Sequence, residues 1–333
     1  MADNLDFQAE KALVLEANAA IDAAAPDATA DVLARWTAPG FRWRGMHPFN
    51  ELSGAAAVAE SFWAPLKTAL GSLQRRSDIF MAGRNALDGG ASVWVVEMGH
   101  LMGLWDQEWL GVNPSRKTAF LRYVEFHRVA GGRIEETACY VDILNFLNHA
   151  DIRVLPPATG ASILTPGPRT HDGLLTEPQD ANEGRATLEL ITAMIADLRG
   201  NGMASPEIHM KRFWRPDMCW FGPGGIGASA YFRGYRRGHT QPFEDGLEFI
   251  RRTEHVCRIG EGLYGGFFGY PSLIMRCTGG FMGLPATSVD AEMRVVDLYR
   301  RQGDKLAENW IFIDLLHFLA QQGLDVLSRL RGL

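Results

Sequence analysis

The chain has 333 residues, of which 47% are hydrophobic and 22% are charged, a balance that suits globular protein and is enough for two domains with cores. Its formal net charge of −6 and the lack of long Lys/Arg runs argue against a nucleic-acid partner. The four cysteines show no paired spacing, which argues against a zinc site or a disulfide framework and favours a reducing compartment.

The first predicted element is an amphipathic helix within residues 6–22, where apolar residues recur at helical spacing. The N-terminal stretch starts acidic and lacks the basic and apolar regions of a secretory signal. No apolar run approaches the ~20 residues that a bilayer-spanning helix needs. We therefore expect a cytoplasmic protein without a membrane partner.

A middle helix and a series of β-rich stretches follow. The predicted strands of this first part are 75–83, 91–101, 118–129 and 133–141. The tight turn "AGG" joins the last two strands and predicts a hairpin. An apolar helical run follows Asp142.

Residues 153–184 are rich in Pro, Gly and Thr and have no apolar periodicity, so they predict a linker. A second series of elements follows the linker, again starting with an amphipathic helix and a middle helix. Its predicted strands are 249–258, 267–281, 291–301 and 305–313. The turn "QGD" joins the last two strands, and an apolar run follows Asp314.

The two series look like copies of one unit. Four landmarks recur in the same order: 35–45 with 212–222, 62–70 with 239–247, 100–104 with 280–284, and 122–144 with 294–316. In the last pair Glu125 and Asp142 align with Asp297 and Asp314 at a constant offset of 172 residues (297 − 125). We predict a first domain over 1–152, the linker over 153–184 and a second copy over 185–333.

The order of elements predicts the fold class. In each copy helices precede strands that are joined by hairpins, which is typical of α+β proteins. We expect the helices of each copy to pack on one face of a curved antiparallel sheet.

The stretch "RVVDLYRRQGDKLAENWIFIDLLHFLAQQG" (294–323), preceded by "TGGFMGLPAT" (278–287), resembles the SnoaL-like, polyketide-cyclase-type branch of the nuclear-transport-factor-2-like superfamily. The first copy matches more loosely, with Ala138 where Trp310 stands. The resemblance implies two tandem cone-shaped α+β barrels, each with a pocket inside its curved sheet. Such folds host polyketide cyclases, ketosteroid isomerases, scytalone dehydratases, epoxide hydrolases and non-catalytic binding domains, so fold does not decide function.

The sequence departs from the cyclases at two positions in each copy. The positions aligned with their general acid/base Asp hold Ile311 and Cys139, and the positions aligned with their pocket His hold Asp297 and Glu125. We therefore do not expect an unchanged aldol-cyclase site.

Four carboxylates are the catalytic candidates. Asp297 and Glu125 stand in mid-strand between apolar neighbours, where burial in a pocket would raise the pKa and prepare a general base. The alternative is a surface charge or an ion pair with a neighbouring strand. Asp314 and Asp142 stand where a strand meets an apolar helix, so each is either a helix N-cap or a pocket acid.

Aromatic and histidine residues near the expected pockets are the substrate-binding candidates. They are Trp43, His47, His100 and His127 in the first copy and Trp220, His239, Tyr264, Tyr299 and Trp310 in the second. The histidines show no metal-ligand spacing, so we expect neither a metal nor another cofactor.

Two functions remain open at this point. The first is a cofactor-independent enzyme that acts on a small, largely apolar organic molecule by carboxylate general acid/base catalysis, of cyclase, isomerase, dehydratase or hydrolase type. The second is a non-catalytic small-ligand-binding or scaffold protein. In either case we expect the two copies to pair within the chain as a pseudo-dimer, with a homodimer left open. An open pocket with an uncompensated carboxylate favours the enzyme, and a closed cone with a salt-bridged Asp297 favours the alternative.

Overall fold

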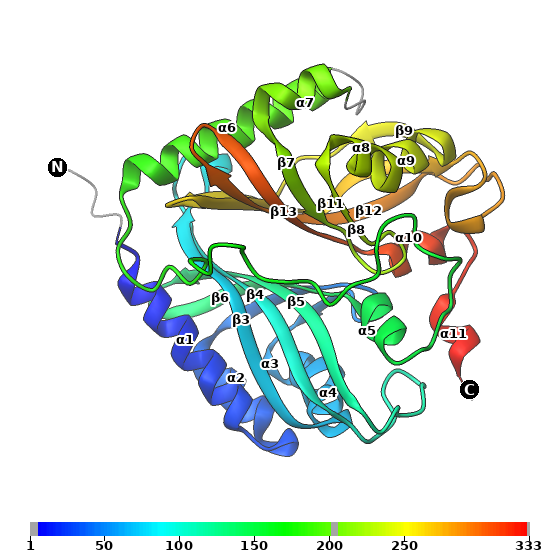
Figure 1. Ribbon diagram of the computed structural model, residues 1–333. Coiled ribbons are helices and arrows are strands. Elements are labelled where there is room, and N and C mark those ends of the chain that lie inside the picture. Colours follow the sequence, from blue (N-terminus) through cyan, green and yellow to red (C-terminus); the bar gives the residue numbers. More distant parts are fainter. Residues whose placement is uncertain (1–5, 201–205, 332–333) are drawn as a thin grey trace.

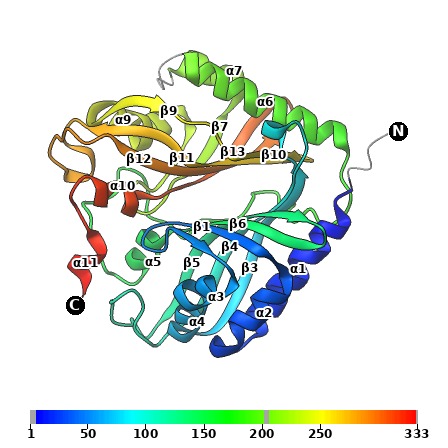
Figure 2. The same cartoon turned by 180° about the vertical axis from the view of Figure 1, so that it is seen from behind.

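The computed structural model describes residues 6–200 and 206–331 of the chain. Figure 1 shows two halves, each a curved sheet with helices on one side. The sheets face each other across the middle of the molecule, and Figure 2 shows from behind that most helices of each half lie on the outside. The chain is thus of the α+β class with two similar halves, as the sequence predicted.

The first half contains helices and one six-stranded sheet. Its helices are α1 (Gln8–Ala23), α2 (Thr29–Trp36), α3 (Ala55–Val58), a π-helical turn (Ala59–Trp63), α4 (Ala64–Ala69) and α5 (Ile143–His149). Its strands are β1 (Thr37–Gly45), β2 (Glu51–Ser53), β3 (Leu70–Arg84), β4 (Val93–Trp105), β5 (Thr118–Ala130) and β6 (Arg133–Val141). The strand order in the sheet is β2-β1-β6-β5-β4-β3.

The second half repeats this plan with seven strands. Its helices are α6 (Ala181–Gly200), α7 (Glu207–Phe213), α8 (Tyr231–Tyr235), a π-helical turn (Arg236–Thr240), α9 (Gln241–Gly246), α10 (Leu315–Gln321) and α11 (Val326–Leu330). Its strands are β7 (Trp214–Phe221), β8 (Ala228–Ala230), β9 (Leu247–Arg252), β10 (Cys257–Glu261), β11 (Tyr264–Cys277), β12 (Ala291–Gln302) and β13 (Lys305–Ile313). The order is β10-β11-β12-β13-β7-β8, and β9 also pairs with β11.

The register of the two hairpins follows the sequence repeat. Glu125 pairs with Cys139 in β5–β6, and Asp297 pairs with Ile311 in β12–β13, at the offset of 172 residues (297 − 125). The predicted copies therefore have the same strand order and the same hairpin register. Helix α6 begins at Ala181, inside the segment predicted as linker, and the domain bounds at 152 and 185 stay a prediction.

Each sheet is mixed, whereas the sequence predicted antiparallel strands throughout. β1 pairs in parallel with β6, and β7 with β13, because helices and three or more strands separate the partners along the chain. The predicted strand 249–258 is divided into β9 and β10. The division lies opposite a bulge in β11 between Gly269 and Leu273, where Pro271 has no N–H to donate to a ladder.

The two sheets pack on each other through their facing sides. Alternate residues point into this contact, since side chains of a strand alternate between its faces. They include Trp94, Val96, Met98, Val124, Phe126 and Tyr140 from the first half and Phe268, Val296, Leu298, Trp310 and Phe312 from the second. Burying each large side chain contributes about 1.5–3 kcal/mol, so this contact holds the halves together strongly.

The segment between the halves packs along both of them. Phe80 bridges to Leu174 and Ala161 to Ala228, and the Trp310 Nε1 donates to the Pro166 oxygen at 2.9 Å. In the parts of the chain that the structure describes, no helix has the length and apolar character to cross a membrane.

Candidate active site in the second half

A cavity of about 370 Å³ lies in the second half, between the inner face of its sheet and the helices that cover it. Most of its wall is aromatic or aliphatic, including Trp214, Trp220, Phe243, Phe249, Met275, Met293, Val295 and Ile311. A few polar side chains interrupt this wall, among them Asp297, Tyr299, Asn309, His239 and Thr240. An apolar cavity of this size with few polar groups is typical of a small-molecule site.

Asp297 lies in the middle of β12 with its side chain on the cavity wall. It faces the same way as Val295 and Tyr299, as strand alternation requires, and is 8% exposed. The Asn309 amide donates to Asp297 Oδ1 at 3.0 Å, and the Tyr299 hydroxyl donates to the same carboxylate. Among the described residues no cation forms an ion pair with Asp297.

The pKa of Asp297 is raised to about 7 because burial removes water from the carboxylate, while the hydrogen bonds from Asn309 and Tyr299 oppose this shift. A carboxyl group with this pKa exchanges protons readily near neutral pH. The sequence expectation of a pocket-facing Asp297 therefore agrees with the geometry of the cavity.

This raised pKa predicts how stability depends on pH. Aspartate in an unfolded chain titrates near 3.9, so Asp297 binds its proton more tightly in the folded protein. Its contribution to stability is fully present below about pH 4 and is lost as the pH rises to about 7. We expect Asp297→Asn to raise the melting temperature by several degrees at pH 8 and by little at pH 5. Calorimetry at both pH values measures this, and an equal shift at both would contradict the assigned pKa.

In the first half, the face of the sheet that the helices cover carries a charged network instead of a carboxylate without an ion-pair partner. Arg75 Nη1 lies 2.8 Å from Glu125 and 3.3 Å from Glu97, and its Nε lies 3.0 Å from Asp22. The Arg75 guanidinium also lies over the rings of Trp63 and Tyr123, at 5.5 and 5.0 Å. Glu125 is thus neutralised by a buried cation, the ion-pair alternative that the sequence left open.

The difference between the halves comes from a few exchanged residues. Opposite Glu125 stands Glu97 on β4, and opposite Asp297 stands Phe267 on β11. The second half thus places an aromatic ring beside its carboxylate where the first half places another acid.

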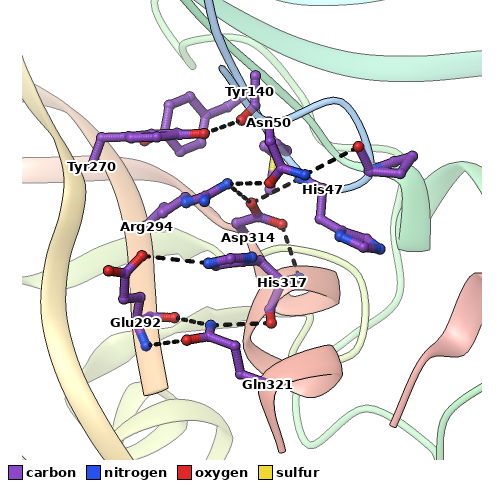
Figure 3. Close-up of polar contacts among 12 residues, drawn as sticks. His47, Asn50, Tyr140, Tyr270, Glu292, Arg294, Asp314, His317 and Gln321 are labelled. Carbon is purple, nitrogen blue, oxygen red and sulfur yellow. Dashed lines mark hydrogen bonds and ion pairs between the residues drawn. The ribbon is translucent and has the colours of Figure 1, made fainter. Parts of the chain in front are cut away.

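Asp314 and Asp142 cap helices at the contact between the halves. Asp314 accepts from the His317 N–H at 3.2 Å, from the His47 N–H at 2.9 Å, and lies 3.3 Å from Arg294 (Figure 3). Burial raises the pKa of Asp314 to about 6, against the opposing effect of Arg294. Neither Asp314 nor Asp142 lines the cavity.

Asp142 makes the reciprocal contact. It accepts from the Asn145 N–H at 3.0 Å and from the Gly224 N–H at 3.0 Å, and Arg122 lies 3.8 Å away. His47 and Gly224 follow the first strand of their own halves, so each capping carboxylate binds backbone of the opposite half. The repeated Asp therefore serves as a helix cap and as a link between the halves.

Three of the nine predicted binding residues lie with Asp297 on the cavity wall: Trp220, His239 and Tyr299. Trp310 and Tyr264 lie in the cluster between the sheets, because strand alternation turns them away from the cavity. The Trp310 indole donates to Pro166, and the Tyr264 hydroxyl donates to Asp172.

The four predicted substrate-binding residues of the first half lie apart from one another. Trp43 packs against Phe62 at 5.3 Å, and His127 hydrogen-bonds Thr137 at 2.9 Å in the interior. His100 lies 3.5 Å from Asp78. His47 belongs to the loop that binds Asp314 (Figure 3).

Asn309 is a site residue that the sequence analysis missed. It pairs with Tyr299 across the hairpin and so shares the face of Asp297. Strand alternation together with the hairpin register would have found it. Residues from α6 and α7, such as Met194 and Met210, come from far along the chain and gave no such signal.

Comparisons with known proteins give structural similarities only. No family model matches the chain, and no curated protein matches it. Similar solved structures include a candidate SnoaL-like polyketide cyclase from Jannaschia sp. CCS1, with 23% identity, a TM-score of 0.35, and coverage of 47% of this chain and 99% of that one. AclR, a candidate hydroxylase from Streptomyces galilaeus, has 21% identity, a TM-score of 0.36, and coverage of 45% and 89%. IdmH, a candidate polyketide cyclase from Streptomyces antibioticus, has 18% identity, a TM-score of 0.32, and coverage of 40% and 98%.

Proposed function

We propose that the cavity of the second half is the active site of a cofactor-independent enzyme. Its substrate would be a small, largely apolar organic molecule, and Asp297 would be the general acid/base. The observation that carries this proposal is a buried Asp297 on an apolar cavity wall, with a pKa of about 7 and without an ion-pair partner among the described residues.

The surrounding residues suit such a role. In its ionised form Asp297 would take a proton from the bound molecule, and in its neutral form it would return that proton at another position. The Asn309 amide and the Tyr299 hydroxyl hold the carboxylate in place by donating to it. This chemistry suits an isomerisation, dehydration or cyclisation, because one carboxyl group can both remove a proton from the substrate and return it.

For the first half, the geometry favours the alternative function, a non-catalytic scaffold. Its carboxylate Glu125 is salt-bridged to Arg75, and aromatic rings enclose this pair. We propose that the first half is a scaffold, which forms the sheet contact and supplies the loop that binds Asp314.

The titration of Asp297 tests the proposed role. Infrared difference spectra between the parent protein and Asp297→Asn should show a protonated carboxyl at pH 5.5 that disappears with a midpoint near pH 7. For any substrate that the parent turns over, kcat/KM should rise with pH over the same range, because the ionised form is the base. A carboxyl that is already ionised at pH 5.5 would contradict the raised pKa on which the proposal rests.

A further inference from the structure

The π-helical turn Arg236–Thr240 forms one wall of the cavity and has a counterpart in the first half, the turn Ala59–Trp63. The two turns align at an offset of 177 residues (239 − 62), the same offset that relates Trp220 to Trp43. Phe62 and Trp63 therefore correspond to His239 and Thr240. The repeat provides an internal comparison between a wall that is packed and a wall that borders a cavity.

In the first half both of these positions hold aromatic rings. The Phe62 ring lies 5.3 Å from the Trp43 ring and 5.0 Å from the Trp63 ring. Trp63 in turn lies under the Arg75 guanidinium, at 5.5 Å. The pair Phe62 and Trp63 thus fills the interior with side chains.

In the second half the same positions are polar. His239 stacks on Trp220 at 4.2 Å and contacts Phe243 at 4.5 Å, so its ring takes the place that Phe62 occupies beside Trp43. The smaller Thr240 replaces Trp63 and leaves space. His239 Nδ1 and Thr240 Oγ1 are buried without a hydrogen-bond partner among the described residues. Buried polar atoms are ordinarily paired, so the unpaired Thr240 hydroxyl on a cavity wall indicates a missing partner.

His239 offers a hydrogen bond but no charge. Burial lowers its pKa to about 3, so the imidazole is neutral at physiological pH and carries one N–H. A proton on Nε2 avoids burying an unpaired N–H at Nδ1. Since His239 lines the cavity, its Nε2–H is the candidate donor to a ligand. The ionisable Asp297 on the same cavity wall disfavours an anionic ligand group.

We propose that His239 and Thr240 form the hydrogen-bonding subsite of the cavity and hold an uncharged acceptor oxygen of an otherwise apolar ligand. We rest this on the proposed function, in which Asp297 transfers a proton elsewhere on the same molecule. The aromatic rings of Trp220 and Phe243 would contact the apolar body of that ligand.

Binding of two matched probes tests the subsite without turnover. Benzophenone and diphenylmethane have nearly the same shape, but only benzophenone has an acceptor oxygen, and it has no hydrogen on the carbons beside its carbonyl for Asp297 to remove. The quantity measured is the ratio of the two Kd values, from quenching of tryptophan fluorescence. We expect His239→Phe and Thr240→Val each to weaken benzophenone binding roughly three- to tenfold relative to diphenylmethane.

Further variants separate a lost hydrogen bond from a disturbed fold. His239→Phe restores the residue type of the first half, and an unchanged melting temperature and diphenylmethane Kd would show that the wall is intact. His239→Gln keeps an N–H donor and should recover part of the preference for benzophenone. His149→Phe, on the exposed side of α5, is the control and should leave the ratio at the parent value.

The possible outcomes are distinguishable. A ratio that is the same in the parent, His239→Phe and Thr240→Val overturns the subsite, even if Asp297→Asn abolishes turnover. A changed ratio together with full turnover in Asp297→Asn would keep the subsite and overturn the role of Asp297.

Discussion

Replacing Asp297 by Asn is expected to lower kcat/KM by about 10²- to 10⁴-fold, the usual contribution of a positioned general acid/base. Asn has nearly the same shape and can still hydrogen-bond Asn309 and Tyr299, but its amide cannot accept a proton at neutral pH. Steady-state kinetics on any substrate of the parent measures the loss. The cavity should still bind diphenylmethane, because the apolar wall is unchanged.

Glu125→Gln is the matched control, since Glu125 is the counterpart of Asp297 in the first half. It lies in the Arg75 network, and we expect the variant to retain turnover. Full activity in Asp297→Asn, or a comparable loss in Glu125→Gln, would show that the chemistry has been assigned to the wrong residue or the wrong half.

Replacing Arg75 by Met is expected to lower the free energy of unfolding by about 3–5 kcal/mol at pH 7, the usual effect of removing one partner from a buried ion pair. The substitution would leave Glu97 and Glu125 together in the interior without their cation. Urea denaturation followed by circular dichroism measures the effect. The destabilisation should shrink toward pH 5, because burial raises the pKa of Glu125. Protonation of Glu125 then removes one of the two negative charges that repel each other.

Arg252→Met is the control for this change. Arg252 pairs with Leu273 on β11 as Arg75 pairs with Leu101 on β4, so the two arginines have equivalent places in their sheets. Arg252 is half-buried and lies over the Phe249 ring at 5.6 Å. We expect its replacement to cost less than that of Arg75, because its side chain is half-buried rather than buried. Equal losses in both variants would mean that the carboxylates of the first half do not depend on Arg75.

Each capping carboxylate makes two contacts, of which the sequence predicted only one. The position of Asp314 between a strand and an apolar helix predicted a cap, and the structure contains that cap. Its second contact, with the His47 backbone 267 residues away, depends on how the halves pack and has no local signal. The same holds for Asp142 and Gly224.

The sequence by itself determined the α+β class, the two copies, the hairpins and the unusual position of Asp297 in mid-strand. Periodicity and turn residues act between neighbours along the chain, and the repeat is found by comparing two parts of the sequence. Strand alternation also placed Asp297 and Tyr299 on one face.

Only the tertiary structure decided which half has the cavity and which residues line it. The two halves share a backbone plan, so the choice depends on how side chains from distant elements fill the interior. Phe62, Trp63 and the Arg75-bound Glu97 fill the first half. The matched places in the second half hold His239, Thr240 and Phe267. Burial then raises the pKa of Asp297, and burial is a property of the packed molecule rather than of the residue.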